Sequence, residues 1–321
     1  MSHHEHLRQA PVRVSIGYTA RDMFKITPIT LLLACHGGPS PDEGSIEPSA
    51  WSWDAPEDLS PVYDEMLVTG AIQALADNAL SLTSQPIFEG YDAAMALADG
   101  SCPAWYEYEG EIFWRGICYT NEGAWFNGQG FFFTYDGVDF GGDGGTWFAE
   151  QVSGTSSVHD PEGHIFNMGG YAFLGTGSHT DGRTSWMSTM GGSFSSTWPM
   201  AAETWMGNDM QPMLGISADL QPSSDIRSVY IYGTIGGLGS PATGIEISQF
   251  SMEDAPGACT TEPTGIVSVR DGIGTWWDVH FSTSSDPTGC DGCGVVIQSG
   301  EEVGQACADF TALLDWGSSP W

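Results

Sequence analysis

Residues 102–118 read CPAWYEYEGEIFWRGIC, and this stretch predicts an antiparallel β-hairpin that turns at Gly110. Residues at equal distances from Gly110 then lie opposite each other, so Cys102 opposes Cys118 and Tyr106 opposes Trp114. Even positions are apolar, Cys or Gly, whereas the odd positions include Glu107, Glu109, Glu111 and Arg115. We therefore expect one face of the hairpin to pack inward, with a disulfide between Cys102 and Cys118.

A second hairpin is predicted near the C-terminus, with its turn at Gly300. The same construction places Cys293 opposite Cys307 and Ile297 opposite Val303. Side chains alternate between the two faces of a strand, so Cys293, Val295 and Ile297 share one face. We expect a second disulfide, between Cys293 and Cys307.

Two further cysteines, Cys259 and Cys290, are left to each other by elimination. Six cysteines in this part of the chain then fit three disulfides. The alternative is that Cys290-Asp-Gly-Cys293 is a redox pair or half of a zinc site, with His280 and Cys307 as further ligands. No second Cys-x-x-Cys pair, which would support zinc, occurs in the sequence, and no paired histidines lie near these cysteines.

Helical spacing is confined to residues 61–98. Pro61 can occupy a first helical turn, and a second short helix is expected from Tyr91 to Ala98, before Asp99-Gly100. The apolar positions expected to form the buried stripe of the first helix are Val62, Met66, Ile72, Leu75 and Leu80.

After residue 100, aromatic and β-branched runs alternate with Gly, Asn, Asp and Pro. We therefore predict a mainly β fold, with antiparallel meander or sandwich-like sheets after a short N-terminal helical segment. The expected units are a β-rich main domain over 62–255 and a small disulfide-stapled β module over 256–321.

A weak internal repeat lies between the two hairpins. Residues 122–133, EGAWFNGQGFFF, align with residues 162–173, EGHIFNMGGYAF, and Phe131 is matched by Tyr171. A duplicated β unit explains this similarity. We expect each copy to turn at its Asn-Gly region, at Asn127-Gly128 and within residues 167–170.

The segment ITPITLLLAC, residues 26–35, is an apolar run that ends at Cys35. It is shorter than the roughly 20 residues that cross a hydrocarbon core, so it is typical of a signal-peptide core. Leu32, Leu33 and Ala34 stand immediately before Cys35, and this pattern resembles the lipobox of bacterial lipoproteins. In that family, a peptidase cleaves before the cysteine, whose thiol and new amino group carry acyl chains. A short buried strand with an incidental cysteine is the alternative interpretation.

The lipobox resemblance implies that residues 1–34 are a signal peptide and that Cys35 is lipidated. Met23-Phe24-Lys25 forms a compact positive start, so translation is expected to begin at Met23. His36 stands where an Asp favours inner-membrane retention in the family, which implies the outer membrane, on its periplasmic side or at the cell surface. Residues 35–61 are rich in Gly, Pro, Ser, Asp and Glu and predict a flexible acidic tether.

Charge separates this leader from the rest of the chain. Four of the 8 Lys and Arg and two of the 41 acids precede Cys35, so 4 Arg and 39 acids remain, a formal charge of −35. Such a field repels phosphate backbones and anionic lipid head groups, so nucleic acid is not an expected partner. The expected partners are the membrane, through the lipid anchor, and a glycan or protein surface.

A loop rich in Asp and Gly, residues 136–145, is the most plausible metal site in the sequence. Calcium takes six to eight oxygen ligands, and Asp136, Asp139, Asp143 and the loop carbonyls could provide several of them. Calcium is therefore the one cofactor that we consider. A solvated surface loop is the simpler interpretation.

Other clusters offer catalytic or ligand residue types with weaker patterns. Glu107, Glu109 and Glu111 could form a glycosidase carboxylate pair. Residues 237–242 imitate a dinucleotide fingerprint, but Pro241 removes the helix that this motif requires. The remaining clusters are Ser178, His179 and Asp181 as triad residue types, and His159, Asp160, Glu162 and His164 as metal-ligand types. We assign no catalytic residue.

Two functional classes remain. The first is a noncatalytic structural, adhesive or binding lipoprotein of the outer membrane, which the disulfide-stapled strands and the missing catalytic motifs favour. The second is a carbohydrate-binding or carbohydrate-active surface protein, because 13 Trp are present and exposed aromatic rings stack on sugar faces. An exposed row of Trp in a groove would favour the second class, and uniformly buried Trp would remove it.

Overall fold

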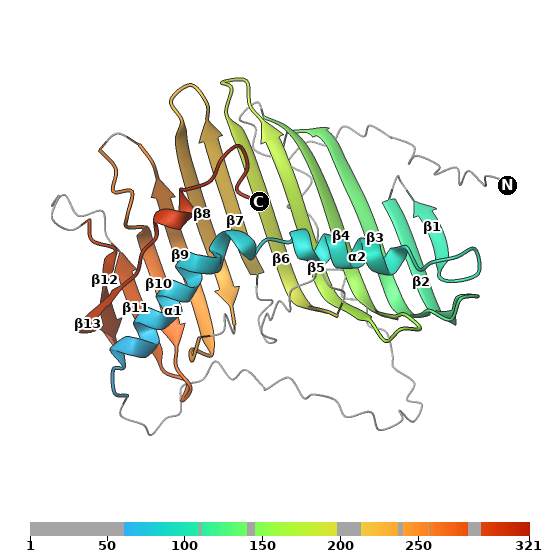
Figure 1. Ribbon diagram of the computed structural model, residues 1–321, viewed down its shortest axis with the longest axis horizontal. Helices are drawn as coiled ribbons and strands as arrows, with labels where there is room; N and C mark the ends of the chain where they lie inside the picture. Colours follow the sequence, from blue (N-terminus) through green and yellow to red (C-terminus); the bar gives the residue numbers. More distant parts are fainter. Residues whose placement is uncertain are drawn as a thin grey trace.

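The computed structural model describes residues 61–108, 111–139, 145–197, 213–236, 240–255, 257–281 and 290–321. Within these residues, thirteen antiparallel strands form a single sheet in which every strand pairs with its neighbours in sequence (Figure 1). The prediction of a mainly β fold with antiparallel meander or sandwich-like sheets is therefore confirmed, and the sheet is of the meander type. The strands are β1 (Ala104–Tyr108), β2 (Glu111–Tyr119), β3 (Trp125–Val138), β4 (Thr146–His159), β5 (Ile165–Ser178), β6 (Thr184–Ser196), β7 (Met213–Gln221), β8 (Ile226–Ile235), β9 (Gly244–Glu253), β10 (Thr264–Arg270), β11 (Trp276–Phe281), β12 (Cys293–Gln298) and β13 (Glu301–Cys307).

Two helices, α1 (Glu65–Asn78) and α2 (Gln85–Met95), run across the strands on one face of the sheet (Figure 1). The helix α1 contacts β10 and β13, and α2 contacts β4, β5 and β6. Short 3₁₀ turns follow α1 (Ala79–Ser81) and β13 (Thr311–Leu313). We call the face that the helices cover the inner face and the opposite one the outer face.

The helices differ in detail from their predicted forms. Val62 and Met66, which were expected to be buried, are 82% and 84% exposed. The reason is that α1 begins only at Glu65 and buries a different row of side chains. That row consists of Val68, Ala71, Ile72, Leu75 and Ala76. The second helix begins at Gln85 rather than Tyr91, because Pro86 fits its first turn, where a missing N–H costs no hydrogen bond.

The register of the first hairpin differs by one residue from the prediction. Tyr106 lies opposite Phe113 rather than Trp114, and Tyr108 lies opposite Glu111 rather than Ile112. A shift of one residue moves side chains to the other face. Trp114 is buried on the inner face as expected, whereas Tyr106 lies on the outer face and is 58% exposed.

The three disulfides form between the expected partners, Cys102 and Cys118, Cys259 and Cys290, and Cys293 and Cys307. The first forms despite the register shift because Cys102 precedes the paired residues of β1. Near the C-terminus, an irregularity between Val296 and Ile297 places Ile297 opposite Glu302 rather than Val303. The strand β10 pairs with β9, so the C-terminal strands continue the same sheet.

The repeat reflects hairpin turns that precede the strands, and the predicted turn positions are wrong. Asn127 and Asn167 lie inside β3 and β5, not at turns. The turns span residues 120–124 and 160–164, where Gly123 and Gly163 have φ of 91° and 96°. Each turn closes in the same way: the N–H of Thr120 or Asp160 donates to the carbonyl O of Ala124 or His164, at 2.9 and 3.0 Å.

A row of glycines crosses the middle of the long strands β3 to β6. Gly130, Gly154, Gly170 and Gly192 lie directly opposite one another on the inner face. A Cβ atom at Gly154, Gly170 or Gly192 would overlap a carbonyl O of the neighbouring strand. At Gly130, a Cβ would lie 2.7 Å from Nε1 of Trp114. The strands therefore approach along this row more closely than any side chain permits.

The glycine row lies beside the helix α2. The indole of Trp114 lies over Gly130, and its Nε1–H donates to the Tyr91 hydroxyl of α2 at 3.1 Å. The ring of Phe166 in β5 packs beside Gly90 of the same helix. Helix and sheet thus fit together at two glycines, Gly130 of the sheet and Gly90 of the helix, each of which leaves space for an aromatic ring.

We expect Gly170→Ala to lower the free energy of unfolding by at least about 2 kcal/mol, because the new Cβ would overlap the backbone of β6. Gly70→Ala is the matched control, since no atom lies within 4 Å of a Cβ at this position in α1. It should stabilise the protein by about 0.5–1 kcal/mol through helix propensity. Urea unfolding of both variants measures these changes, and equal stabilities for the two would contradict the close approach of the strands.

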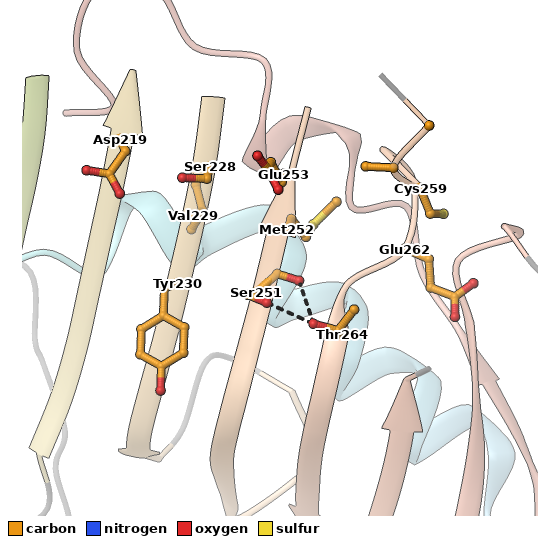
Figure 2. Close-up of a pocket in the computed structure, with 12 residues that line it drawn as sticks. Asp219, Ser228, Val229, Tyr230, Ser251, Met252, Glu253, Cys259, Glu262 and Thr264 are labelled. Carbon is orange, nitrogen blue, oxygen red and sulfur yellow. Dashed lines mark hydrogen bonds between the residues drawn. The ribbon is translucent and has the colours of Figure 1, made fainter. Parts of the chain in front are cut away.

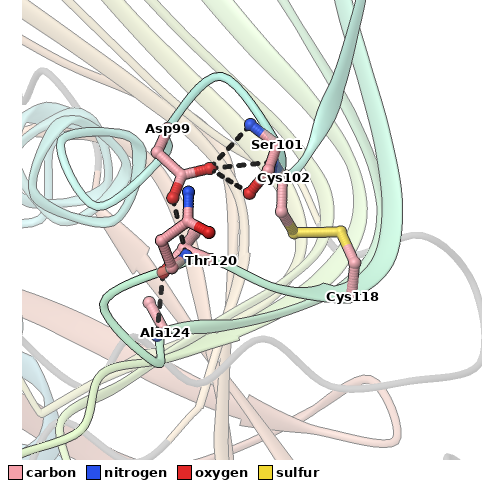
Figure 3. Close-up of a disulfide and its surroundings, with 7 residues drawn as sticks. Asp99, Ser101, Cys102, Cys118, Thr120 and Ala124 are labelled. Atoms are coloured by element: carbon pink, nitrogen blue, oxygen red, sulfur yellow. Dashed lines mark hydrogen bonds between the residues drawn. A yellow bond between two sulfur atoms is a disulfide. The ribbon is translucent and has the colours of Figure 1, made fainter.

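The carboxylate of Asp99 joins the start of the sheet to the turn between β2 and β3 (Figure 3). It accepts hydrogen bonds from the Ser101 hydroxyl at 2.5 Å, and from the backbone N–H groups of Asn121 at 2.7 Å, Ser101 at 2.7 Å and Cys102 at 3.0 Å. The Ser101 hydroxyl and then these N–H groups hold the pKa of Asp99 well below its usual range. The Cys102–Cys118 disulfide lies next to this network.

This network predicts a specific loss of stability in acid. A carboxylate whose pKa is lowered by folding stabilises the protein above the unfolded pKa of about 3.9, and the contribution is lost as the pH falls through the folded-state pKa. The melting temperature of the wild type should exceed that of Asp99→Asn by a constant margin from pH 7 to about 5. The margin should shrink as the pH falls below about 4. A margin that stays constant down to pH 2 would show that the charge of Asp99 does not matter.

Candidate functional site

A groove of about 1160 Å³ crosses the strands β1 to β5 on the outer face. Its lining combines aromatic rings, polar side chains and bare backbone. The side chains that line it from the outer face are Tyr106, Phe113, Arg115, Gln129, Phe131, Ser153, Thr155 and Tyr171. Both helices lie on the inner face, so the groove opens on the opposite side of the sheet.

One wall of the groove is a straight row of residues that the strand registers bring together. Tyr106, Phe113, Phe131, Ser153 and Tyr171 lie directly opposite one another from β1 to β5. We call this set the aromatic row. The rings of Phe113 and Phe131 have centroids 5.8 Å apart. With neighbouring strands about 4.8 Å apart, the row is about 19 Å long.

The ring of Tyr171 is held flat against the sheet by the glycine opposite it. Gly191 is its register partner in β6, and a Cβ there would lie 2.6 Å from Cε1 of Tyr171. Burial, and next the neighbouring Tyr232, raise the pKa of Tyr171. Its hydroxyl therefore remains protonated at neutral pH and can donate a hydrogen bond.

The other wall is a parallel row of polar residues. Arg115, Gln129 and Thr155 lie directly opposite one another in β2, β3 and β4, and Gly169 and Ser193 continue the row. We call this set the polar row. It lies two residues along each strand from the aromatic row, about 7 Å away. Between them, the backbone of the glycine row forms the floor, because Gly130, Gly154 and Gly170 also line the groove.

Aromatic faces beside hydrogen-bonding groups form a surface suited to an amphipathic, flat ligand. A pyranose ring has a face of C–H groups and an edge of hydroxyls, so it can stack on the aromatic row and bond to the polar row. Among the described residues that line the groove, Arg115 is the one with a charged side chain. The aromatic and polar rows together are suited to binding a sugar.

The tryptophans do not form the exposed row that the sequence suggested as a test. Trp51, Trp53, Trp198 and Trp205 lie outside the described residues. Within the described residues, one Trp is clearly exposed, Trp105 at 44%, and it lies on the inner face of β1. The buried ones are Trp114, Trp147, Trp186, Trp277 and Trp316. Tyrosine and phenylalanine take the place of Trp in the groove.

The aromatic row was missed because the first hairpin was placed one residue out of register. The repeat carried a usable signal, since it matches Phe131 with Tyr171 at an offset of 40 residues. With the turns at residues 120–124 and 160–164, this offset corresponds to two strands of the meander. Matched residues of the two copies must then lie on the same row of the same face.

A second pocket, of about 550 Å³, lies between β7 and β10 and contains three acids, Asp219, Glu253 and Glu262 (Figure 2). Burial raises the pKa of Glu262. Its carboxylate points away from the Ser251 and Thr264 hydroxyls, which hydrogen-bond to each other at 2.8 Å. The three carboxylates do not converge on one point, so we assign no cation site to this pocket.

The carboxylate pair suggested for glycoside hydrolysis is not formed. Glu107 lies opposite Ile112 on the inner face, and Glu111 lies opposite Tyr108 on the outer face, because of the register shift. Glu109 lies outside the described residues. Two carboxylates on opposite faces cannot flank one glycosidic bond.

The triad residue types also separate. His179 Nε2 lies 2.7 Å from the Ser185 hydroxyl, not from Ser178, and Ser185 donates in turn to Asp219. Asp181 accepts from the backbone N–H of Arg183 at 3.0 Å and caps the turn. In a catalytic triad the aspartate orients the histidine, whereas Asp219 binds the serine. Both His179 and Ser185 are buried, so the contacts hold the β5–β6 turn to β7.

The metal-ligand types come together in one place. Ligand atoms of Asp160, Glu162 and His164 all lie within 4.8 Å of one another. Asp160 already accepts from His164 Nδ1 at 2.7 Å and from the backbone N–H groups of Glu162 and His164, both at 2.8 Å. These hydrogen bonds hold the turn at residues 160–164, and they explain why the three side chains lie together. His159 lies outside this cluster, and its Nε2 is 2.8 Å from the Ser157 hydroxyl.

The acidic loop is only partly described. Asp136 is in β3 opposite Phe148, and Asp139 is exposed just after β3, while Asp143 lies outside the described residues. Calcium binding at this loop stays a prediction.

The zinc or redox interpretation of Cys290 and Cys293 is wrong, because each forms a disulfide with another cysteine. Residues 237–239, the start of the segment that imitates a dinucleotide fingerprint, lie outside the described residues.

No protein-family model matches the chain, and no curated protein or solved structure matches it either. In the described part of the chain, none of the helices is both long and apolar enough to cross a membrane. The chemistry of the groove is therefore the basis for a functional proposal.

Proposed function

We propose that the protein is an exported, noncatalytic carbohydrate-binding protein, anchored to the outer membrane by a lipid on Cys35. The single observation that supports binding of carbohydrate is the aromatic row beside the polar row in the outer-face groove. An adhesive role follows if the glycan belongs to another surface. The anchor is supported by the lipobox resemblance, and Cys35 lies outside the described residues.

The shape of the groove supports a chain of sugars over a single compact ligand. A row of about 19 Å offers rings on β1, β2, β3 and β5, with the Ser153 hydroxyl between Phe131 and Tyr171. Several sugar rings can therefore stack in succession. The flat Tyr171 ring is fixed before binding, which reduces the entropy that the complex must lose.

Export is supported independently by the disulfides. Disulfides persist in oxidising compartments such as the periplasm or the cell surface, and are rare in the bacterial cytosol. Three of them staple the described domain. A tether over 35–61 of up to about 80 Å when stretched would carry the domain away from the bilayer.

The anchor can be tested by replacing the lipidated atom. We expect the Cys35→Ser protein to leave the membrane fraction and to lose the mass of its acyl chains, because serine has no thiol for thioether attachment. Fractionation and mass spectrometry of the full chain measure both. If the variant stays in the membrane fraction at the wild-type level and mass, lipidation at Cys35 is wrong.

The groove can be tested at its most exposed ring. Tyr106→Ala removes a side chain that is 58% exposed, so it should leave the melting temperature within about 2 °C. Affinity for an oligosaccharide found on a glycan array should fall by about two- to tenfold, since one stacking contact contributes roughly 0.5–1.5 kcal/mol. Isothermal titration calorimetry measures the loss.

The matched control is Tyr119→Ala, which removes another exposed tyrosine of the outer face that does not line the groove. Its affinity should equal that of the wild type. An equal loss in both variants would show that the sugar binds elsewhere. The absence of any binding partner on the array would reject the carbohydrate proposal.

A further inference from the structure

Arg115 is in an unusual position for a cation in this protein. Residues 36–321 contain only four basic side chains, Arg115, Arg183, Arg227 and Arg270. Arg115 is exposed on the outer face, and no carboxylate of a described residue lies within 4 Å of its guanidinium. Among the described residues that line the groove, it is also the only charged one.

The other three arginines have structural partners. Arg183 lies 3.7 Å from Asp219 and 3.9 Å from Asp181. Arg227 lies 3.0 Å from Asp225 and stacks over the Trp316 ring, 5.8 Å from its centroid. Arg270 donates to the Thr243 hydroxyl at 3.2 Å. Each of these contacts explains the arginine without a ligand, which leaves Arg115 to be explained.

The surroundings of Arg115 are those of a ligand contact. It begins the polar row, directly opposite Gln129, and lies on the same face of β2 as Phe113 of the aromatic row. The chain has a formal charge of −33, from 41 acids against 8 Lys and Arg, yet Arg115 forms an ion pair with none of the described acids. A guanidinium presents two parallel N–H donors that match the two oxygens of a carboxylate.

We propose that Arg115 makes the groove selective for oligosaccharides that carry a carboxylate, that is, uronic-acid sugars, and this inference rests on the proposed carbohydrate function. The sugar stacks on Phe113 and Phe131 while its carboxylate binds Arg115 in a bidentate pair. Gln129 and Thr155 then accept from or donate to the hydroxyls of the same or the next sugar. The uronate is thus recognised by both rows at once.

The charge of the whole protein limits how acidic the ligand is. One carboxylate of the ligand contacts Arg115 directly and is attracted by it. Further carboxylates of the same ligand lie too far from Arg115 for this contact and are repelled by the negative charge of the protein. A ligand with one uronate among neutral sugars is therefore favoured over a polyanion. Nucleic acids and heavily sulfated glycans are excluded by the same field.

The test uses the full chain and pairs of oligosaccharides that differ only at C6 of one sugar, as a carboxylate or a hydroxymethyl group. We expect the wild type to bind the uronate member of a pair about tenfold more tightly by calorimetry. Arg115→Gln should lose this preference, so that the variant binds the uronate and the neutral member of a pair with equal affinity. Arg115→Lys should keep part of the preference, because lysine retains the charge but not the two parallel donors.

Arg115 is exposed and without an ion-pair partner among the described residues, so Arg115→Gln should melt at the wild-type temperature. Equal binding of both members by the wild type, or a preference that survives Arg115→Gln, would overturn the role of Arg115 and leave the carbohydrate proposal standing. If neither member of any pair binds, the carbohydrate proposal fails and the uronate selectivity fails with it. Tighter binding of a polyuronate than of the single uronate would overturn the limit set by charge.

Discussion

The close approach of the backbones of β3, β4, β5 and β6 along the glycine row is the constraint on which the rest of the structure depends. A Cβ at Gly170 would overlap the neighbouring carbonyl O, so these strands cannot pair in this way with any other residue. On the inner face, the row leaves space that Trp114 and α2 occupy. On the outer face, the same backbone is the floor of the groove. Fold and candidate site therefore share one cause.

Glycine also explains the aromatic content of the chain. Four rings lie over their register partners in a neighbouring strand: Trp114 over Gly130, Trp147 over Gly177, Tyr171 over Gly191 and Tyr232 over Gly215. A ring that lies flat on glycine covers backbone that would otherwise face water. The tryptophans that the structure describes thus belong mainly to packing against the sheet. The case for carbohydrate depends instead on the tyrosine and phenylalanine side chains of the groove.

Features that depend on local sequence pattern, namely the meander and the disulfides, could be predicted from the sequence. The face of the sheet on which a side chain lies could not, because a shift of one residue in strand register moves it to the other face. Alternation and turn residues were sufficient for the antiparallel meander, and opposed cysteines were sufficient for the disulfides. The connection at residues 109–110 is compatible with two registers, and choosing the wrong one placed Tyr106 on the inner face. The groove needs four correct registers in succession from β1 to β5, so a single error in the first hides it.

A crystal structure of the protein with its best-bound oligosaccharide tests the central claim most directly, that the two rows over the glycine floor form a carbohydrate site. The account predicts sugar rings stacked on Phe131 and Tyr171, with hydroxyls facing Gln129 and Thr155. Sugar bound only in the pocket between β7 and β10, or at Tyr230 and Tyr232, would contradict it.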